Sequence, residues 1–113
     1  MKCSLKFQFS FEKEAKCLGK RYPSMKSDIA SLCEEIMANP NLGTDLGGGL
    51  RKIRMSIASK GRGKSGGARV ITFSVIISVE ETEVNLLTIY DKSERESISR
   101  AEIEQLLEKN GLR

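Results

Sequence analysis

The chain has 113 residues, a formal net charge of +4 and no histidine. This length supports one modest core and excludes a second catalytic domain, so residues 1–113 are expected to form one unit. Because the commonest general base is missing, any acid–base chemistry must use Lys, Arg, Tyr, Asp or Glu. The sequence has no signal peptide and no apolar run near the ~20 residues of a membrane span, which predicts a cytoplasmic protein without a membrane partner.

Three cysteines, Cys3, Cys17 and Cys33, are odd in number and widely spaced. Without histidine they do not complete a zinc site, so they are expected to be free thiols. No metal and no cofactor is therefore predicted.

Positive charge is concentrated in one part of the chain. No Asp or Glu occurs between Asp45 and Glu80, and this window contains seven basic residues. These seven positive charges exceed the net charge of +4 of the whole chain, so the rest of the chain carries a net negative charge. A local positive field of this kind attracts RNA, DNA or an acidic protein.

The first half of the chain predicts one strand followed by two helices. Leu5–Phe9 alternates apolar Leu5, Phe7 and Phe9 with polar residues, which is typical of a strand with one buried face. From Phe11 to about Lys20 the composition favours helix. A second helix is predicted from Ser24 to Ala38, because apolar residues recur at spacings of three, four and seven between Pro23 and Asn39-Pro40.

The second half predicts three strands and a final helix. After a Gly-rich loop at 41–49, strands are expected at 50–57, 70–79 and 84–90, with a mobile, exposed, cationic hairpin loop at 59–67. In the last helix Ser99 is the expected N-cap, Glu102 completes a capping box, and Gly111 caps the end. The predicted class is α+β, an antiparallel β-sheet packed against helices in the order β-α-α-β-β-β-α.

Lys52 and Arg54 are the first candidate site residues. Strand alternation places both side chains on the face opposite Ile53, Met55 and Ile57. Such a pair is either a solvated strand face or a cationic patch, and the absence of acidic neighbours favours the patch.

Three further candidates lie at strand ends. Arg69 follows a Gly-Gly pair that permits close approach of another backbone or a phosphate, so it is either a phosphate clamp or an arginine that covers the end of the strand. Tyr90 and Lys92 lie at the end of the last strand. Tyr90 either stacks on a base or donates a proton, or it closes the core, and Lys92 is placed to neutralise charge.

Three segments resemble the RelE/HigB branch of the bacterial RelE/ParE toxin superfamily. They are GLRKIR at 49–54, SKGRGKSGGARVI at 59–71 and LLTIYDKSE at 86–94. The resemblance covers roughly residues 20 to 95 and implies a RelE-like fold and ribosome-dependent cleavage of mRNA that inhibits translation. It also implies a cognate antitoxin as partner, with DNA contacted only indirectly through that antitoxin.

The resemblance further implies a histidine-free active site of the RelE type. In such a site the 2′-hydroxyl attacks the adjacent phosphate. The site must deprotonate that hydroxyl, stabilise the crowded phosphorane and protonate the leaving 5′-oxygen, with cations in place of a histidine pair. Matched residues are Lys52 and Arg54 as the basic strand pair, Arg69 as the phosphate-contacting arginine, and Lys92 as a second basic position. The tyrosine near the C-terminus of the best-known RelE enzymes has no counterpart between Ser93 and Arg113, so Tyr90, a cation or a ribosomal group is left to act as the acid.

Four more basic residues are expected to bind RNA without taking part in the chemistry, namely Arg51, Lys60, Arg62 and Lys64. Two other functions remain open at this point. One is a ParE-like inhibitor of DNA gyrase without nuclease activity, and the other is a non-enzymatic RNA-binding module.

Overall fold

The computed structural model of the chain describes residues 2–113. It confirms the predicted α+β class, with a five-stranded sheet packed against three α-helices. In chain order the elements are β1 (Lys2–Phe7), α1 (Phe9–Arg21), α2 (Met25–Ala38), β2 (Thr44–Gly47), β3 (Leu50–Met55), the short 3-10 helix η1 (Ala58–Lys60), β4 (Ala68–Ser78), β5 (Glu81–Asp91) and α3 (Arg100–Lys109).

The sheet is mixed and not purely antiparallel as predicted. Its strand order is β1-β5-β4-β3-β2, and the three pairs β2–β3, β3–β4 and β4–β5 are antiparallel. β1 instead pairs in parallel with β5, from Lys2 opposite Glu81 to Phe7 opposite Leu86. Hairpin connections force neighbouring strands to be antiparallel, whereas β1 is followed by two helices, so no tight turn fixes its direction.

The first strand ends earlier than the alternation predicted. Phe9 was expected on the buried side of this strand, but it is the first residue of α1 and is 76% exposed. The chain turns at Gln8, whose backbone N–H donates to Leu86 O and whose side-chain amide donates to the buried Asn85 at 2.7 Å. Alternation alone does not reveal where these long-range hydrogen bonds stop the strand.

The Gly-rich segment at 41–49 was predicted as a loop and contains β2. This strand has only four residues and lies at the edge of the sheet, with a register shift between Asp45 and Gly47. So short an edge strand shows no period-2 pattern, because it buries almost no side chain.

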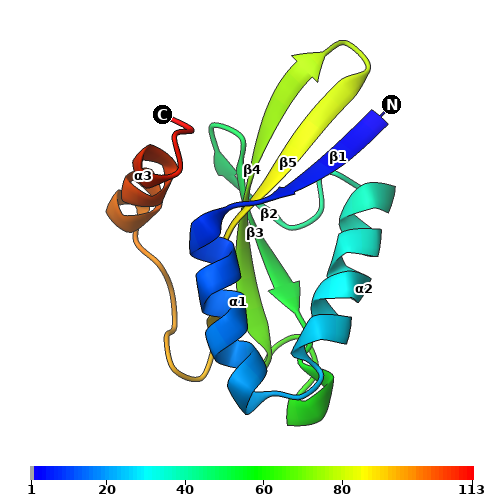
Figure 1. Cartoon of the computed structure of the whole chain (residues 1–113), viewed down its shortest axis with the longest axis vertical. Helices are drawn as coiled ribbons and strands as arrows, with labels where there is room; N and C mark the ends of the chain where they lie inside the picture. The colour runs from blue at the N-terminus through cyan, green and yellow to red at the C-terminus, as the bar shows by residue number, and fades with distance from the viewer. Residues whose placement is uncertain (1) are drawn as a thin grey trace.

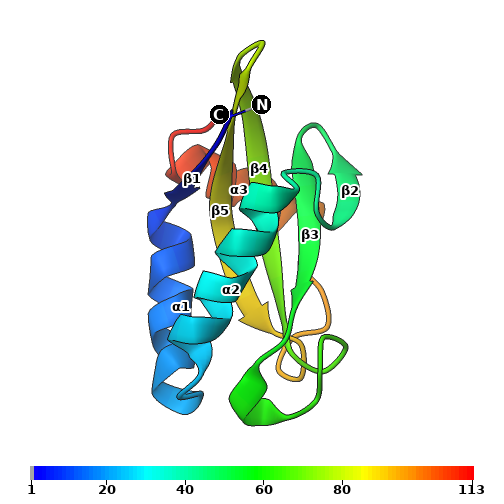
Figure 2. The same ribbon diagram turned by 90° about the vertical axis from the view of Figure 1, so that its right-hand side faces the viewer.

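Helices cover both faces of the sheet (Figures 1 and 2). α1 and α2 pack over one face, where the larger core cluster includes Phe11, Leu32 and Ile53. α3 packs on the other face through Ile103 and Leu107, which contact Leu50, Ile71 and Leu87 of the strands. Within residues 2–113, no helix is long and apolar enough to cross a membrane.

The predicted caps of α3, Ser99 and Gly111, are confirmed, but the predicted capping box is only half formed: within residues 2–113 the Glu102 carboxylate accepts from Ser99 Oγ and pairs with Arg95, and not with the Ser99 backbone N–H. Ser99 Oγ accepts the backbone N–H of Glu102 at 3.2 Å, and this satisfies one of the free amides at the start of the helix. At the other end Gly111 adopts a φ of 71°, and the N–H of Leu112 donates to Leu107 O at 2.8 Å.

Gly67 lies close to the backbones of β3 and of the segment that follows β5. A Cβ atom at this position would lie 2.1 Å from Met55 O on β3, and Gly67 O accepts the backbone N–H of Lys92 at 3.0 Å. The Gly-Gly pair therefore permits close approach of other backbone segments, as the sequence indicated.

We expect Gly67→Ala to lower the free energy of unfolding by roughly 2 kcal/mol, because the added methyl forces the backbones of β3 and β4 apart. Urea denaturation measures this change. The control is Gly19→Ala in α1, where the methyl meets nothing within 4 Å and should stabilise the helix by about 0.5 kcal/mol. Equal stability of the two variants would contradict the close approach.

Candidate functional site

Arg54, Arg69 and Tyr90 form one row across three adjacent strands. Arg54 of β3 is the register partner of Arg69 of β4, and Arg69 is the register partner of Tyr90 of β5. Directly opposed residues in antiparallel strands project from the same face of a sheet. Lys52 lies two residues before Arg54 and shares this face by the period of the strand. The sheet thus brings four predicted site residues together.

This face of the sheet has an apolar half and a cationic half. α3 covers the apolar half, which includes Leu50 and Ile71, and the row with Lys52 occupies the rest. Arg54 is exposed and Lys52 is half-buried, whereas Arg69 and Tyr90 are only 6% and 9% exposed. The site is therefore a partly buried cationic surface next to α3.

Arg69 is held by the loop that precedes its strand. Its Nη1 donates to Lys64 O at 3.0 Å and to Ala68 O at 3.1 Å, and its Nη2 donates to Ser65 O at 3.2 Å. A guanidinium has five N–H donors, so two stay uncommitted among the contacts of residues 2–113. Arg69 therefore fixes the loop at the end of its strand, and its contact with a phosphate stays a prediction.

Tyr90 has a buried hydroxyl that finds no hydrogen-bond partner within the described part of the chain. Burial raises the pKa of this phenol, and the nearby guanidinium groups of Arg69 and Arg95 offset only part of that rise. The phenol therefore keeps its proton at neutral pH, which suits a hydrogen-bond donor or a general acid and excludes a base.

Arg95 belongs to the same surface and was not predicted. Its guanidinium lies 5.8 Å from the centroid of the Tyr90 ring, and it also pairs with Glu102 in the first turn of α3. Arg95 lies on the segment between β5 and α3, so no strand period places it near Tyr90. Only the tertiary structure reveals this contact.

A cavity of about 610 Å³ lies beside Tyr90, between α1, β5 and α3. Thr88, Tyr90 and Arg95 line this cavity, together with Lys13 of α1 and Lys109 of α3. This volume is within the range of pockets that hold small organic groups.

Lys92 follows the row at the end of β5. Its Nζ donates to the backbone oxygen of Glu96 at 3.1 Å, and its backbone N–H is bound by Gly67. Lys52, Arg54, Arg69 and Lys92 share one property. In residues 2–113, no carboxylate oxygen lies within 4 Å of their side-chain nitrogens.

The four residues predicted to bind RNA are separated by the fold. Arg51 lies on the opposite face of β3, where it donates to Asn41 O at 3.0 Å. Lys64 is exposed and lies 3.9 Å from a carboxylate oxygen of Glu35, and Arg62 is exposed. Lys60, in contrast, ends η1 and is largely buried, so the prediction of an exposed loop is wrong at this residue. The structure brings none of them into the row, and their RNA contacts stay predictions.

Lys60 is one of the groups that bind the buried carboxylate of Asp91. Its Nζ lies 2.6 Å from Oδ1, the Tyr22 hydroxyl donates to Oδ2 at 2.5 Å, and Ser93 donates through its backbone and its hydroxyl. Burial alone would raise the pKa of Asp91, but these hydrogen bonds outweigh it and hold the pKa well below its ordinary value. The Asp91 cluster, comprising Tyr22, Lys60, Asp91 and Ser93, is thus a structural anchor.

We expect Lys60→Met to destabilise the fold by about 3 kcal/mol, because it leaves the Asp91 carboxylate buried without its cation. Arg62→Met is the matched control and should change stability by less than about 0.5 kcal/mol, since Arg62 is exposed. Thermal and urea denaturation of the two variants at neutral pH measure the difference. A Lys60 variant as stable as the Arg62 variant would show that this ion pair is dispensable.

Comparison with known families agrees with this arrangement. A family model described as "RelE toxin of RelE / RelB toxin-antitoxin system" matches residues 7–111. The match extends over nearly the whole chain and includes every element from α1 to α3. Membership of such a system implies an antitoxin as partner. The chain belongs to the RelE toxin family.

Proposed function

We propose that this chain is a ribosome-dependent mRNA endonuclease that inhibits translation through its cationic sheet face. One observation carries the proposal, namely the row of Arg54, Arg69 and Tyr90 beside Lys52. Among residues 2–113, it combines positive charges that have no carboxylate oxygen within 4 Å with a protonated phenol whose hydroxyl has no hydrogen-bond partner. An RNA phosphate supplies both the negative charge and the hydrogen-bond acceptor that this row lacks.

The proposed reaction is an internal transfer at one phosphate of the mRNA. The 2′-oxygen loses its proton and bonds to phosphorus, the bond from phosphorus to the 5′-oxygen breaks, and a cyclic phosphate and a 5′-hydroxyl result. Arg54 and Arg69 stabilise the charge that accumulates on the phosphate oxygens. Tyr90 donates its proton to the leaving oxygen. Lys52 is placed either to take the proton from the 2′-hydroxyl in its neutral amine form, or to neutralise the attacking oxygen while that proton passes to water.

The burial of two residues of the row supports a requirement for the ribosome. Arg69 and Tyr90 are more than nine-tenths buried, so an RNA strand that diffuses freely meets mainly Arg54 and Lys52. Productive contact with all four residues requires an mRNA held in a fixed, distorted conformation. A ribosome that binds the message on both sides of the cleaved bond supplies this positioning. Positioning of the reacting groups accounts for a large part of the rate enhancement in reactions of this kind.

The test is primer extension on a reporter mRNA, with and without purified ribosomes. We expect cuts within codons only when ribosomes are present. Arg54→Ala should reduce the rate by about 10²- to 10³-fold, because a preorganised charge at the phosphate is lost. Arg113→Ala, which removes an exposed arginine at the C-terminus, should cut like the wild type.

Two results would overturn the proposed function. Intact mRNA together with inhibited DNA gyrase would indicate a ParE-like inhibitor. Salt-sensitive RNA binding without cleavage on active ribosomes would indicate a binding module.

Tyr90→Phe tests the acid and separates chemistry from stability. Because the hydroxyl has no hydrogen-bond partner among residues 2–113, its removal should leave stability unchanged or raise it by up to about 1 kcal/mol. The same change should slow cleavage by about 10²-fold or more if the phenol protonates the leaving oxygen. Single-turnover cleavage and thermal denaturation are measured on the same preparation. Full activity of the Phe variant would exclude Tyr90 as the acid.

A further inference from the structure

The β4–β5 hairpin ends in an apolar tip that the reaction does not use. Ile76, Ile77 and Val79 are 79%, 53% and 96% exposed, although aliphatic side chains that lie next to one another are normally buried. The hairpin extends beyond β2 and β3 (Figure 1). We call residues 74–80 the hairpin tip.

The hairpin tip has an open strand edge as well as exposed side chains. β3 begins at Leu50, opposite Phe73 of β4, and Ser74 N–H donates to Gly49 O at 2.9 Å. Beyond this hydrogen bond, the outer edge of β4 has no neighbouring strand within residues 2–113. An apolar strand with an open edge is a template for pairing with another strand.

A pocket of about 340 Å³ lies at the base of the hairpin tip. Arg51, Ser74 and Ile76 line it, together with the glycines at 47–49. Because Arg51 is the register partner of Thr72, the pocket lies on the face of the sheet opposite the row of the candidate site. Ser74 Oγ is buried and has no hydrogen-bond partner among residues 2–113. The pocket thus combines a cation with an unsatisfied hydroxyl.

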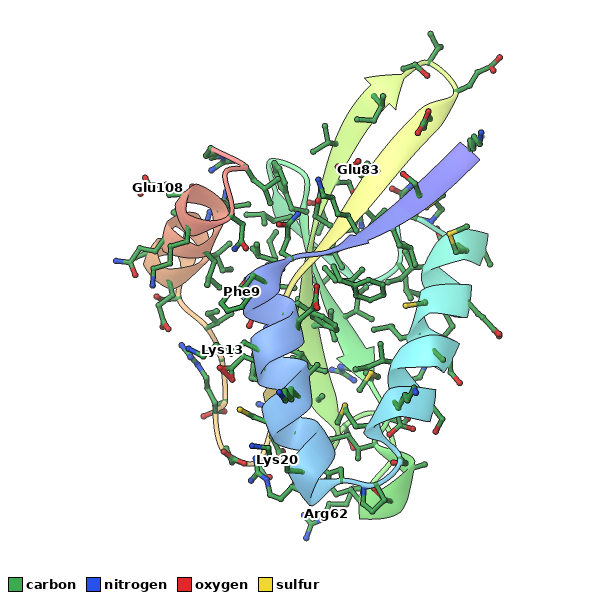
Figure 3. All side chains as sticks on the ribbon, viewed as in Figure 1. Phe9, Lys13, Lys20, Arg62, Glu83 and Glu108 are labelled. Carbon is green, nitrogen blue, oxygen red and sulfur yellow. The ribbon has the colours of Figure 1, made fainter. Side chains whose placement is uncertain are left out.

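The charges of the hairpin tip and of the pocket are complementary. Residues 74–83 contain no basic residue and three acidic ones, Glu80, Glu81 and Glu83. Figure 3 shows Glu83 on the projecting part of the hairpin, and within residues 2–113 none of the three forms an ion pair. In the pocket, Arg51 donates to backbone carbonyls, and the largely exposed Asp45 carboxylate lies 3.9 Å from its Nη2. The guanidinium is therefore only partly neutralised.

A two-fold axis at Ile76 joins these features in two copies of the chain. When the open edges of β4 pair antiparallel about this residue, Ser78 of the second copy lies opposite Ser74 of the first. Glu80 is four residues after Ile76, and Arg51 is level with Thr72, four residues before it. The pairing therefore brings Glu80 of each copy to the level of Arg51 of the other. The register shift between Ile76 and Ser78 marks a bulge, which bends its strand, so the turn with Glu80 need not collide with β3.

We propose that the hairpin tip and the adjacent pocket form an interface between two copies of this chain. The exposed aliphatic side chains of the two tips pack together. Glu80 of each copy enters the pocket of the other, where Arg51 and the Ser74 hydroxyl donate to its carboxylate. A second copy is favoured over an unrelated protein, because one surface supplies both the acidic, apolar tip and the basic pocket that receives it. The pocket lies on the face opposite the row, so this inference does not rest on the proposed function.

Sedimentation velocity over a series of chain concentrations tests the interface. A contact of this small size predicts a dimer with a Kd of about 10 µM. Ile76→Ser/Val79→Ser should weaken dimerisation at least about 10-fold, because the aliphatic contact is lost. Phe9→Ser is the matched control, since Phe9 is 76% exposed but lies at the start of α1, and it should dimerise like the wild type. A wild type that stays monomeric at about 1 mM, or a tip variant that dimerises like the control, would overturn the inference.

Exchange of the two charges tests the two-fold geometry. Glu80→Arg and Arg51→Glu should each weaken dimerisation at least about 10-fold, because each places like charges together at both contacts of the dimer. An equimolar mixture of the two variants should restore dimers, since each contact then joins a glutamate to an arginine. A mixture that stays monomeric, although thermal denaturation shows both variants folded, contradicts the proposed pairing. If Arg51→Glu does not fold, the exposed Glu80→Arg decides alone, and wild-type dimerisation of that variant contradicts the pairing.

Discussion

The carboxylate of Asp91 is the interaction on which the arrangement of the site depends. It is buried at the end of β5 and accepts hydrogen bonds from the α1–α2 turn through Tyr22, from η1 through Lys60 and from the following turn through Ser93. A buried charge is tolerated only when its partners are in place, so these three segments are fixed together. The loop that begins at η1 is the one whose carbonyls hold Arg69, and the turn after Asp91 leads to Arg95.

The two faces of one sheet have separate tasks because strand alternation sends neighbouring side chains in opposite directions. In β3, Ile53 and Met55 complete the core under α1 and α2, while Lys52 and Arg54 between them face the other side. The core and the cationic face are thus built from the same short strand. In β3, a substitution of Ile53 or Met55 therefore changes stability, and a substitution of Lys52 or Arg54 changes the charge of the site.

A cationic site without carboxylates has a cost and an advantage. Arg54 and Arg69 lie side by side in the register, and no carboxylate oxygen of the described residues 2–113 lies within 4 Å to screen their repulsion. Arg69 offsets part of this cost through three backbone carbonyls, which bind a cation without neutralising it. The site therefore keeps its positive potential for a phosphate, and a protonated Tyr90 remains beside it.

The sequence by itself determined the α+β class, the two N-terminal helices, the caps of α3 and the placement of Lys52 and Arg54 on one strand face, because these depend on local periodicity and local hydrogen bonds. The tertiary structure alone decided the parallel pairing of β1, the edge strand β2, the exposure of Phe9, the burial of Lys60 against Asp91 and the contact of Arg95 with Tyr90. Each of these depends on partners far apart in the chain. Local pattern gives the direction of a side chain, but it does not give the identity of the group that meets it.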